Sequence, residues 1–166
     1  MILSFRKATN NDLKEIVSLY NDSILQLDNY GINQWDEIYP NQDVIKEDIN
    51  KKQMYVGTIN SSIAVTFVLN EETDEEYNSG KWHNSTDPYM VVHRLCVNCN
   101  LQNKGIGYKT MQHIESFLSS KNIKAIRLDA FSENPYSLQL YKRLCYNIVG
   151  TAHWRKGVFY LMEKLI

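Results

Sequence analysis

The stretch from residue 94 to residue 108 constrains the fold of this chain more than any other part of its sequence. Residues 89–97 are apolar apart from two adjacent positions, as in a strand that is covered on both faces. After a polar loop, Gly105 and Gly107 open a segment with the spacing of a helix. Such a turn presents successive backbone N–H groups to an anion, and glycine lets a phosphate approach closely. The sequence therefore predicts an anion-binding turn, with Lys104 adding positive charge.

Three nucleotide-binding patterns compete for this turn. The dinucleotide fingerprint G-x-G-x-x-G lacks its third glycine because Thr110 stands there, although Asp129 lies near the acidic position that the pattern expects. A Walker loop does not fit, since no Gly-Lys-Ser/Thr follows a glycine at the required distance. The third pattern, Q/R-x-x-G-x-G/A, is matched by Gln102, Gly105 and Gly107.

The spacing of apolar residues predicts an alternation of strands and helices around this turn. The predicted strands are 3–7, 54–59, 63–69, 89–97, 123–131, 146–154 and 158–164. The predicted helices are 13–27, 43–50, one that Gly105 opens, and one that Asn134 caps with Pro135 at its first position. The stretch 71–88, which begins with five acidic residues in six positions, is expected to be a loop. This order predicts one α/β (α+β) domain over residues 1–166, with a mixed sheet and one central βαβ crossover.

Composition excludes several classes of function. Lys plus Arg is 18 and Asp plus Glu is 19, so the net charge of −1 does not favour nucleic-acid binding. The sequence has no apolar run of membrane-spanning length and no signal peptide at its start, so we expect a cytoplasmic protein without a membrane partner. The three cysteines and four histidines show no ligand spacing, which predicts no metal site.

Several segments at matching positions along the chain together resemble the GNAT superfamily of acyl-CoA-dependent N-acyltransferases. They are Arg94-Leu95-Cys96-Val97, Gln102-x-x-Gly105-x-Gly107, Ile126-Arg127-Leu128-Asp129-Ala130, Asn134 followed by Leu140-Tyr141-Lys142-Arg143-Leu144, and Phe159 to Lys164. The resemblance implies a GNAT-like, mostly antiparallel sheet of about seven strands with helices on both faces. It also implies direct transfer of an acetyl group from acetyl-CoA to a primary amine of a small molecule or peptide. The alternative is a non-catalytic acyl-CoA-binding or protein-interaction module with the same fold.

The resemblance assigns a cofactor site and one catalytic group. The backbone of Asn103 to Tyr108 would hold the pyrophosphate. The end of the strand 89–97 would pair with the pantetheine arm beside a bulge. A backbone N–H near Leu95 or Cys96 would stabilise the oxyanion. The cofactor residues so implied are Leu95, Cys96, Val97, Gln102, Asn103, Lys104, Gly105, Ile106, Gly107, Tyr108, Asn134 and Tyr141. Tyr141 would protonate the departing CoA thiolate, or else be a core tyrosine. Asn134 would face the cofactor arm, or only cap its helix.

The general base has more than one candidate. An alkylamine with a pKa of about 10.4 is nearly all charged at neutral pH, so supplying its neutral form is worth about 5 kcal/mol. His93, on the central strand, is either that base or a satisfied core histidine. Glu37 and Asp36 lie where the family forms its acceptor wall, and would act as base, hold a cationic substrate, or only be exposed. Trp35 and Tyr39 beside them suit a cationic or aromatic acceptor, or else form a local hydrophobic plug.

One departure from the family pattern concerns the backbone. The family usually has glycine where Cys145 stands, so we expect the turn there to be made without a positive φ, which would strain a cysteine. The acidic run 71–76 would steer a cationic acceptor or simply be solvated. Acetyl-CoA and an unidentified amine are therefore the expected partners, and a homodimer is left open.

Overall fold

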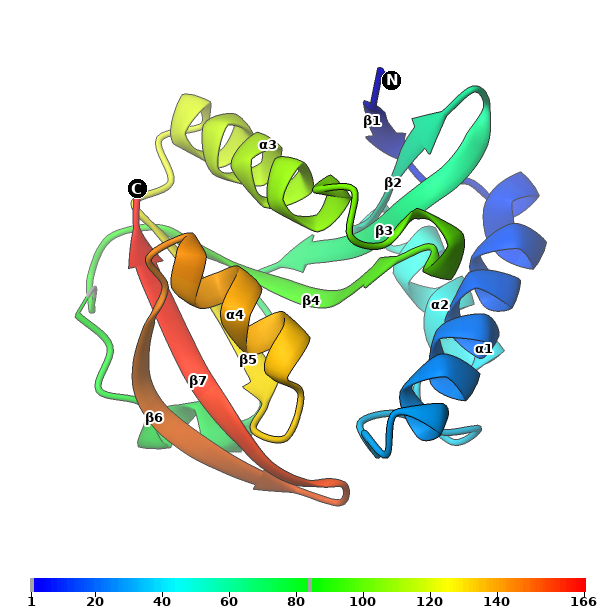
Figure 1. Ribbon diagram of the computed structural model, residues 1–166. Helices are drawn as coiled ribbons and strands as arrows, with labels where there is room; N and C mark the ends of the chain where they lie inside the picture. Colours follow the sequence, from blue (N-terminus) through cyan, green and yellow to red (C-terminus); the bar gives the residue numbers. More distant parts are fainter. Residues whose placement is uncertain (1, 84) are drawn as a thin grey trace. The chain divides into compact units, whose positions relative to one another are not determined.

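The structure, a computed structural model, describes residues 2–83 and 85–166 of the chain. Its strands are β1 (Ser4–Lys7), β2 (Met54–Ile59), β3 (Ser62–Asn70), β4 (Tyr89–Val97), β5 (Ala125–Phe131), β6 (Asn147–Trp154) and β7 (Gly157–Leu165). Its α-helices are α1 (Leu13–Asn29), α2 (Gln42–Asn50), α3 (Ile106–Ser120) and α4 (Pro135–Arg143) (Figure 1). Short 3-10 helices are η1 (Asn10–Asp12), η2 (Glu75–Ser79) and η3 (Cys99–Leu101).

The strands form one seven-stranded sheet in the order β1-β2-β3-β4-β5-β7-β6. β4 and β5 are parallel and are joined through α3, which is the predicted βαβ crossover. The pairs β1–β2, β2–β3, β5–β7 and β6–β7 are antiparallel. The mixed, mostly antiparallel sheet predicted from the element order is therefore confirmed.

The segment 71–88 was expected to be a loop throughout, and this expectation is wrong in one place. Glu75–Ser79 forms η2, which Asp74 precedes in an extended conformation. The helix is short and acidic, so its only strong apolar signal is Tyr77, which is 4% exposed. Burial of this one ring, more than helix propensity, accounts for a helical turn in so polar a stretch.

The chain divides into two compact units, which we describe separately. The first unit contains Met1–Leu69 and Arg94–Thr110, and the second contains Asn70–His93 and Met111–Ile166. In the first unit, α1 and α2 lie side by side (Figure 1) and bury a cluster that includes Ile16, Tyr20 and Ile45. η1, which leads into α1, begins with a capping box in which the Asp12 carboxylate accepts the Thr9 N–H at 2.7 Å.

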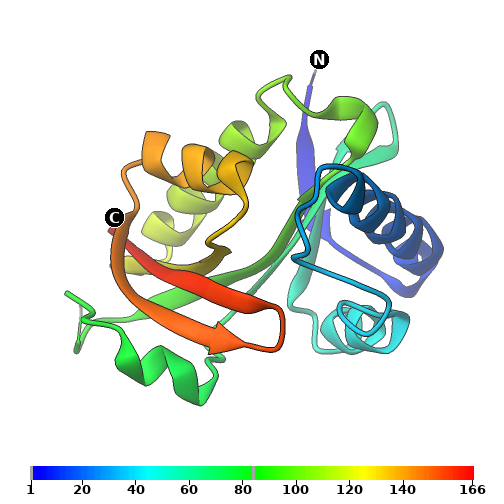
Figure 2. The same ribbon diagram turned by 60° about the horizontal axis from the view of Figure 1, so that its bottom comes forward.

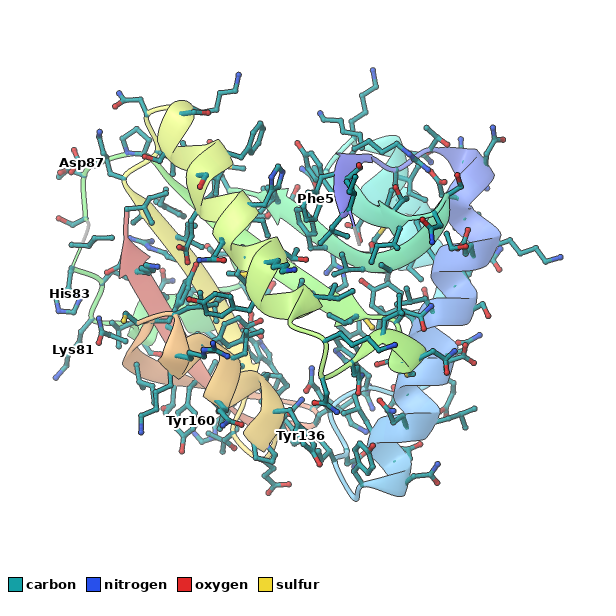
Figure 3. The ribbon with its side chains drawn as sticks, turned by 45° about the horizontal axis from the view of Figure 1, so that its top comes forward. Phe5, Lys81, His83, Asp87, Tyr136 and Tyr160 are labelled. Atoms are coloured by element: carbon teal, nitrogen blue, oxygen red, sulfur yellow. The ribbon has the colours of Figure 1, made fainter. Side chains whose placement is uncertain are left out.

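The second unit has helices on both faces of its strands. α4 lies on one face of β5–β7–β6 and η2 on the other, beside β6 (Figure 2). Below η2 lies a cluster of Tyr77, Val91, Val149, Ala152 and Leu161. The side chain of Tyr136, at the start of α4, points away from the unit (Figure 3) and is 57% exposed.

Each of the four α-helices in the described chain ends in the same hydrogen-bonded turn, the Schellman motif. Just past each helix stands one left-handed residue, with φ of +71° for Gly31, +58° for Lys52, +62° for Asn122 and +65° for Cys145. The expectation that Cys145 avoids a positive φ is therefore wrong. Two backbone hydrogen bonds, from Cys145 N–H to Lys142 C=O and from the next N–H to the C=O of residue 141, hold it there against the strain.

Candidate active site

The predicted anion-binding turn lies in the first unit and is built by two consecutive caps. Asn98 starts η3 by accepting the Asn100 N–H on its side chain at 3.0 Å, while its own N–H donates to Ala64 C=O. The chain then passes through Asn103 and Gly105, with φ of +60° and +75°. Lys104 between them does not have a positive φ. Alternation of backbone handedness turns successive N–H groups toward one side, which is the geometry of an anion-binding nest.

The turn leads directly into the first turn of α3. The hydrogen-bond ladder begins with Lys109 N–H donating to Gly105 C=O at 3.0 Å, so the N–H groups of residues 106–108 lie at the positive end of the helix. This first turn contains no acidic residue. Ile106 is 2% exposed and anchors the helix start, and the buried Thr110 hydroxyl donates to the Ile106 carbonyl. The arrangement suits a phosphate and nothing on the helix start repels one.

The end of β4 leads into this turn, and its side chains alternate between two apolar clusters of the first unit. Leu95 and Val97 pack against the cluster that contains Ile106, while Cys96 belongs to the cluster under α1. Burial raises the pKa of the Cys96 thiol to about 12, so this cysteine is protonated and unreactive at neutral pH. The C-x-x-C spacing of Cys96 and Cys99 therefore does not behave as a redox motif.

Arg94 distorts the strand, and hydrogen bonds to three other residues stabilise its unusual backbone conformation. The residue has φ of +51°, inside an otherwise extended strand. Its guanidinium binds the Asp48 carboxylate through Nε at 3.0 Å and Nη2 at 2.6 Å, and Nη1 donates to the Tyr39 hydroxyl at 2.6 Å. Its carbonyl accepts the Tyr20 hydroxyl at 2.6 Å. A residue in this conformation interrupts the extended backbone of β4, while the bulge implied by the resemblance stays a prediction.

Arg94 and Asp48 were not predicted as site residues, although the sequence carries a signal for them. Arg94 is charged within an apolar run, and Asp48 lies on the face of α2 that carries Ile45 and Ile49. Two opposite charges, each set among apolar residues, indicate a pair. Burial raises the pKa of Asp48 even though Arg94 opposes this shift, so the site carries a real desolvation cost.

The loop that follows α1 supplies the other candidates in the first unit. Trp35 is 8% exposed and meets the Tyr20 ring edge to face, so it is the hydrophobic plug and is closed to an acceptor. Asp36 accepts the N–H groups of Ile38 and Tyr39 and thereby shapes the loop. Glu37 is exposed. Its role as a base stays a prediction.

Tyr141 and Asn134 lie on α4, in the second unit. Asn134 accepts the N–H groups of Tyr136 and Ser137 on its side chain, so the predicted helix cap is confirmed. Tyr141 is 7% exposed, and its ring meets that of Tyr146 edge to face at 5.8 Å. Burial, together with the charge of Asp129, raises the pKa of the Tyr141 hydroxyl above its ordinary value. Tyr141 therefore carries its proton at neutral pH, as a general acid must.

His93, on the part of β4 that belongs to the second unit, has a defined orientation. Its Nε2 lies 2.8 Å from Asn70 Oδ1. The same oxygen accepts the Glu72 N–H at 3.0 Å, which fixes which end of the amide faces the ring. His93 Nε2 therefore donates a hydrogen bond to the Asn70 amide oxygen.

The structure gives Asp129 a role other than the one that the dinucleotide pattern would give it. Asp129, the acidic residue of the dinucleotide pattern, accepts the Tyr77 hydroxyl at 2.7 Å and so serves another contact. Among the described residues, no group of three potential metal ligands occurs, and no helix has the length and apolarity to cross a membrane.

Comparison with known proteins decides the family. The chain matches the sequence profile of the Acetyltransferase (GNAT) family over residues 16–145. This protein belongs to the GNAT acetyltransferase family. It is 24% identical, over 162 residues, to the uncharacterized N-acetyltransferase YesJ of Bacillus subtilis, an alignment that covers 96% of this chain and 88% of the relative.

Solved structures agree on the GNAT fold. A GNAT family acetyltransferase from Streptococcus agalactiae superposes with a TM-score of 0.86 at 21% identity, covering 99% of this chain and 95% of that one. The PaiA N-acetyltransferase of Thermoplasma acidophilum, solved in complex with coenzyme A, superposes with a TM-score of 0.72 at 15% identity over the whole of both chains. The GNAT-like fold expected from the sequence is thus confirmed.

Proposed function

We propose that this protein is an acetyl-CoA-dependent N-acetyltransferase that acts, as a single domain, on a primary amine of a small molecule or peptide. The observation that carries the proposal is the turn before α3, where left-handed Asn103 and Gly105 alternate with Lys104. Such a nest, followed at once by the positive end of a helix, suits the pyrophosphate of coenzyme A. The coenzyme A bound to the Thermoplasma PaiA relative supports the same ligand class.

The cofactor would use mainly backbone groups. The N–H groups from Asn103 to Tyr108 would bind the pyrophosphate, with Gln102 at the entry to the turn and the Lys104 ammonium adding charge. The polar backbone of Leu95 and Val97 would pair with the amides of the pantetheine arm. A backbone N–H near Leu95 or Cys96 would stabilise the oxyanion, just past the distortion at Arg94.

Tyr141 is the proposed general acid. Proton transfer from a phenol of ordinary pKa near 10 to a thiolate whose conjugate acid has a pKa of about 8.5 is slightly unfavourable in free energy. The raised pKa of Tyr141 makes this transfer more unfavourable. The role is therefore donation of a hydrogen bond that becomes proton transfer as charge develops on sulfur. Asn134 would hold the start of the same helix and face the cofactor arm. His93 or Glu37 would take the proton of the amine.

The test begins with calorimetric titration of the purified protein with acetyl-CoA, using NAD as the control ligand. We expect acetyl-CoA to bind and NAD not to bind. Release of free thiol with a panel of primary amines then separates an enzyme from a non-catalytic binding module. A folded protein that does not bind acetyl-CoA would contradict the proposal and leave the family likeness as a likeness of fold.

A further inference from the structure

Arg94 differs from the other left-handed residues of the described chain because it lies inside a strand. Its φ is +51°, and β4 extends from Tyr89 to Val97. The other described non-glycine residues with a positive φ lie in a turn or just past a helix, at positions 52, 60, 61, 103, 122 and 145. A residue with a Cβ avoids this conformation, and a protein that imposes it usually does so at a functional site.

Two features of Arg94 cost free energy in the folded state. One is its left-handed backbone, and the other is the burial of its charge together with that of Asp48. The two side chains are 13% and 8% exposed. A buried ion pair adds little net stability, because the desolvation of both charges offsets their attraction. Stability alone therefore does not account for this arrangement.

Tyr20 fixes the direction of the peptide group between Arg94 and Leu95. Its hydroxyl donates to the Arg94 carbonyl at 2.6 Å. This peptide is trans, and in a planar trans peptide the C=O and the N–H point in opposite directions. The Leu95 N–H therefore points away from Tyr20. The Tyr20 ring is itself held in place, since it is fully buried and meets Trp35 edge to face.

Asp48 holds the side chain of the same arginine. Its carboxylate accepts hydrogen bonds from both Nε and Nη2, which fixes the plane of the guanidinium. Asp48 lies on α2 and Tyr20 on α1, so two helices of the first unit each bind one residue of β4. Backbone and side chain are thus restrained together, and the left-handed φ persists in spite of its cost.

We propose that Tyr20 and Asp48 are positioning residues, which hold the peptide between Arg94 and Leu95 so that the Leu95 N–H donates to the thioester carbonyl of acetyl-CoA. The inference rests on the proposed function and adds two residues that act through Arg94. When the amine nitrogen bonds to the acetyl carbon, the C=O electron pair moves to oxygen. The pair then returns as the C–S bond breaks and sulfur keeps its electrons, while one proton leaves nitrogen and one reaches sulfur. A donor already aimed at that oxygen stabilises the charge as it develops.

Two substitutions release the peptide from different sides with little change in shape. Tyr20→Phe removes only the hydroxyl that binds the Arg94 carbonyl. Asp48→Asn keeps an oxygen but removes the charge that holds the guanidinium. Asp12→Asn is the matched control, because it weakens another Arg–Asp pair of the first unit, in which Arg6 lies 2.8 Å from the carboxylate.

The first measurement follows the bound carbonyl and needs no acceptor. Each protein is saturated with acetyl-CoA that carries an isotopic label at the acetyl carbonyl carbon, and the C=O stretch is recorded by isotope-edited infrared spectroscopy. A hydrogen bond to the oxygen weakens the C=O bond and lowers the wavenumber of this stretch. Tyr20→Phe and Asp48→Asn should therefore both raise the wavenumber relative to the wild type, whereas Asp12→Asn should leave it unchanged.

Kinetics provide a second measurement. With an amine that the wild type acetylates, Tyr20→Phe and Asp48→Asn should each lower kcat about tenfold or more, because an oxyanion donor acts mainly in the transition state. The Kd for acetyl-CoA, measured by calorimetry, should change less than about twofold for the same reason. Asp12→Asn should lower the melting temperature and leave kcat unchanged, which is the pattern that a purely structural role of Tyr20 and Asp48 would also give.

Two outcomes would overturn the inference. One is a folded Tyr20→Phe protein that binds acetyl-CoA with the carbonyl stretch and kcat of the wild type. The other is an Asp12→Asn protein that changes both quantities as much as Tyr20→Phe does, since the effect would then follow stability. If Asp48→Asn does not fold, Tyr20→Phe decides by itself. Failure of the proposed function is distinguishable, because the wild type would then not bind acetyl-CoA, and the inference would fall with it.

Discussion

The N–H of Tyr146 donates to the carbonyl of Tyr141 across the end of α4, at 3.0 Å, and the rings of the same two residues meet edge to face. The contact between these two positions is the hydrophobic part of a Schellman motif. It fixes the last turn of α4 and, with it, the position of the proposed general acid. The same two residues therefore link the termination of a helix to the proposed chemistry.

Tyr141→Phe should lower kcat about 100-fold or more, because a general acid typically contributes a factor of this size. Its affinity for acetyl-CoA should change little, since the substitution removes one hydroxyl and no backbone contact. Steady-state kinetics with a responsive amine, together with calorimetry, measures both quantities. Unchanged turnover would assign the proton to water or to another group.

Tyr146→Phe is the matched control, since it removes a hydroxyl from the adjoining buried ring. The Tyr146 hydroxyl is buried beside Glu115, which helps to raise its pKa, but the two groups do not form a hydrogen bond of good geometry. Its removal loses at most this weak contact, so the free energy of unfolding should change by less than about 1 kcal/mol. Turnover should stay close to that of the wild type, and a loss as large as that of Tyr141→Phe would point to a packing effect.

Gly105→Ala should weaken acetyl-CoA binding about tenfold, because the alanine resists φ of +75° and disturbs the nest. Gly31 provides an unusually close control: its φ is +71°, and a Cβ at either glycine would meet no atom within 4 Å. Both alanine variants should lose about 1 kcal/mol of stability. Calorimetry should show weaker binding only for Gly105→Ala, and equal weakening in both would remove the turn from the cofactor site.

Cys145→Gly should raise the free energy of unfolding by about 0.5–1 kcal/mol, as glycine adopts φ of +65° without a Cβ clash, partly offset by the greater freedom of its unfolded chain. Cys145→Ala keeps the strain and removes the thiol, so it should give no gain. Urea unfolding of the two variants separates these causes. An equal gain in both would attribute the effect to the thiol.

The Arg6–Asp12 pair should make the free energy of unfolding depend on pH in the acidic range. Two hydrogen bonds of 2.8 Å from Arg6, with two more from the N–H and hydroxyl of Thr9, lower the pKa of Asp12 to about 2 from 3.8. The folded state thus binds this proton less readily than the unfolded state, so the contribution is complete above pH 3.8 and is lost as the pH falls toward 2. Because Arg6 is half exposed, we expect about 1 kcal/mol.

Asp12→Asn measures that contribution. Its deficit in unfolding free energy relative to wild type should be constant near neutral pH and shrink as the pH falls through this window. Arg6→Gln removes the other partner of the pair, and its deficit in unfolding free energy should depend on pH in the same way. A deficit that persists at the lowest pH would mean that Asp12 acts only as a neutral hydrogen-bond acceptor.

Regular elements could be predicted well because their apolar residues repeat with a clear period. The bounds of β2 and β4 agree with the predicted 54–59 and 89–97, and α2 begins one residue before the predicted 43. The turn before α3 could also be placed, since two glycines after a buried strand have few other uses. These features depend on local sequence alone.

The features that were missed depend on contacts between distant residues. The left-handed conformation of Arg94 is stabilised by Asp48, which lies 46 positions earlier. No local sequence pattern predicts this conformation. Likewise Asp129 accepts the hydroxyl of Tyr77, which lies 52 positions earlier in the chain. Charged residues within apolar strands were the available signal, and they indicate that a partner exists without saying which one.

The positions of the tryptophans give the protein a built-in optical probe. The chain has three, of which Trp35 lies in the core of the first unit, while Trp82 and Trp154 both pack around Tyr77 in the second. In a Trp35→Phe variant, all indole fluorescence arises from the second unit. Comparison of its unfolding curve with that of the wild type would show whether the two units lose their structure in one cooperative step or in two.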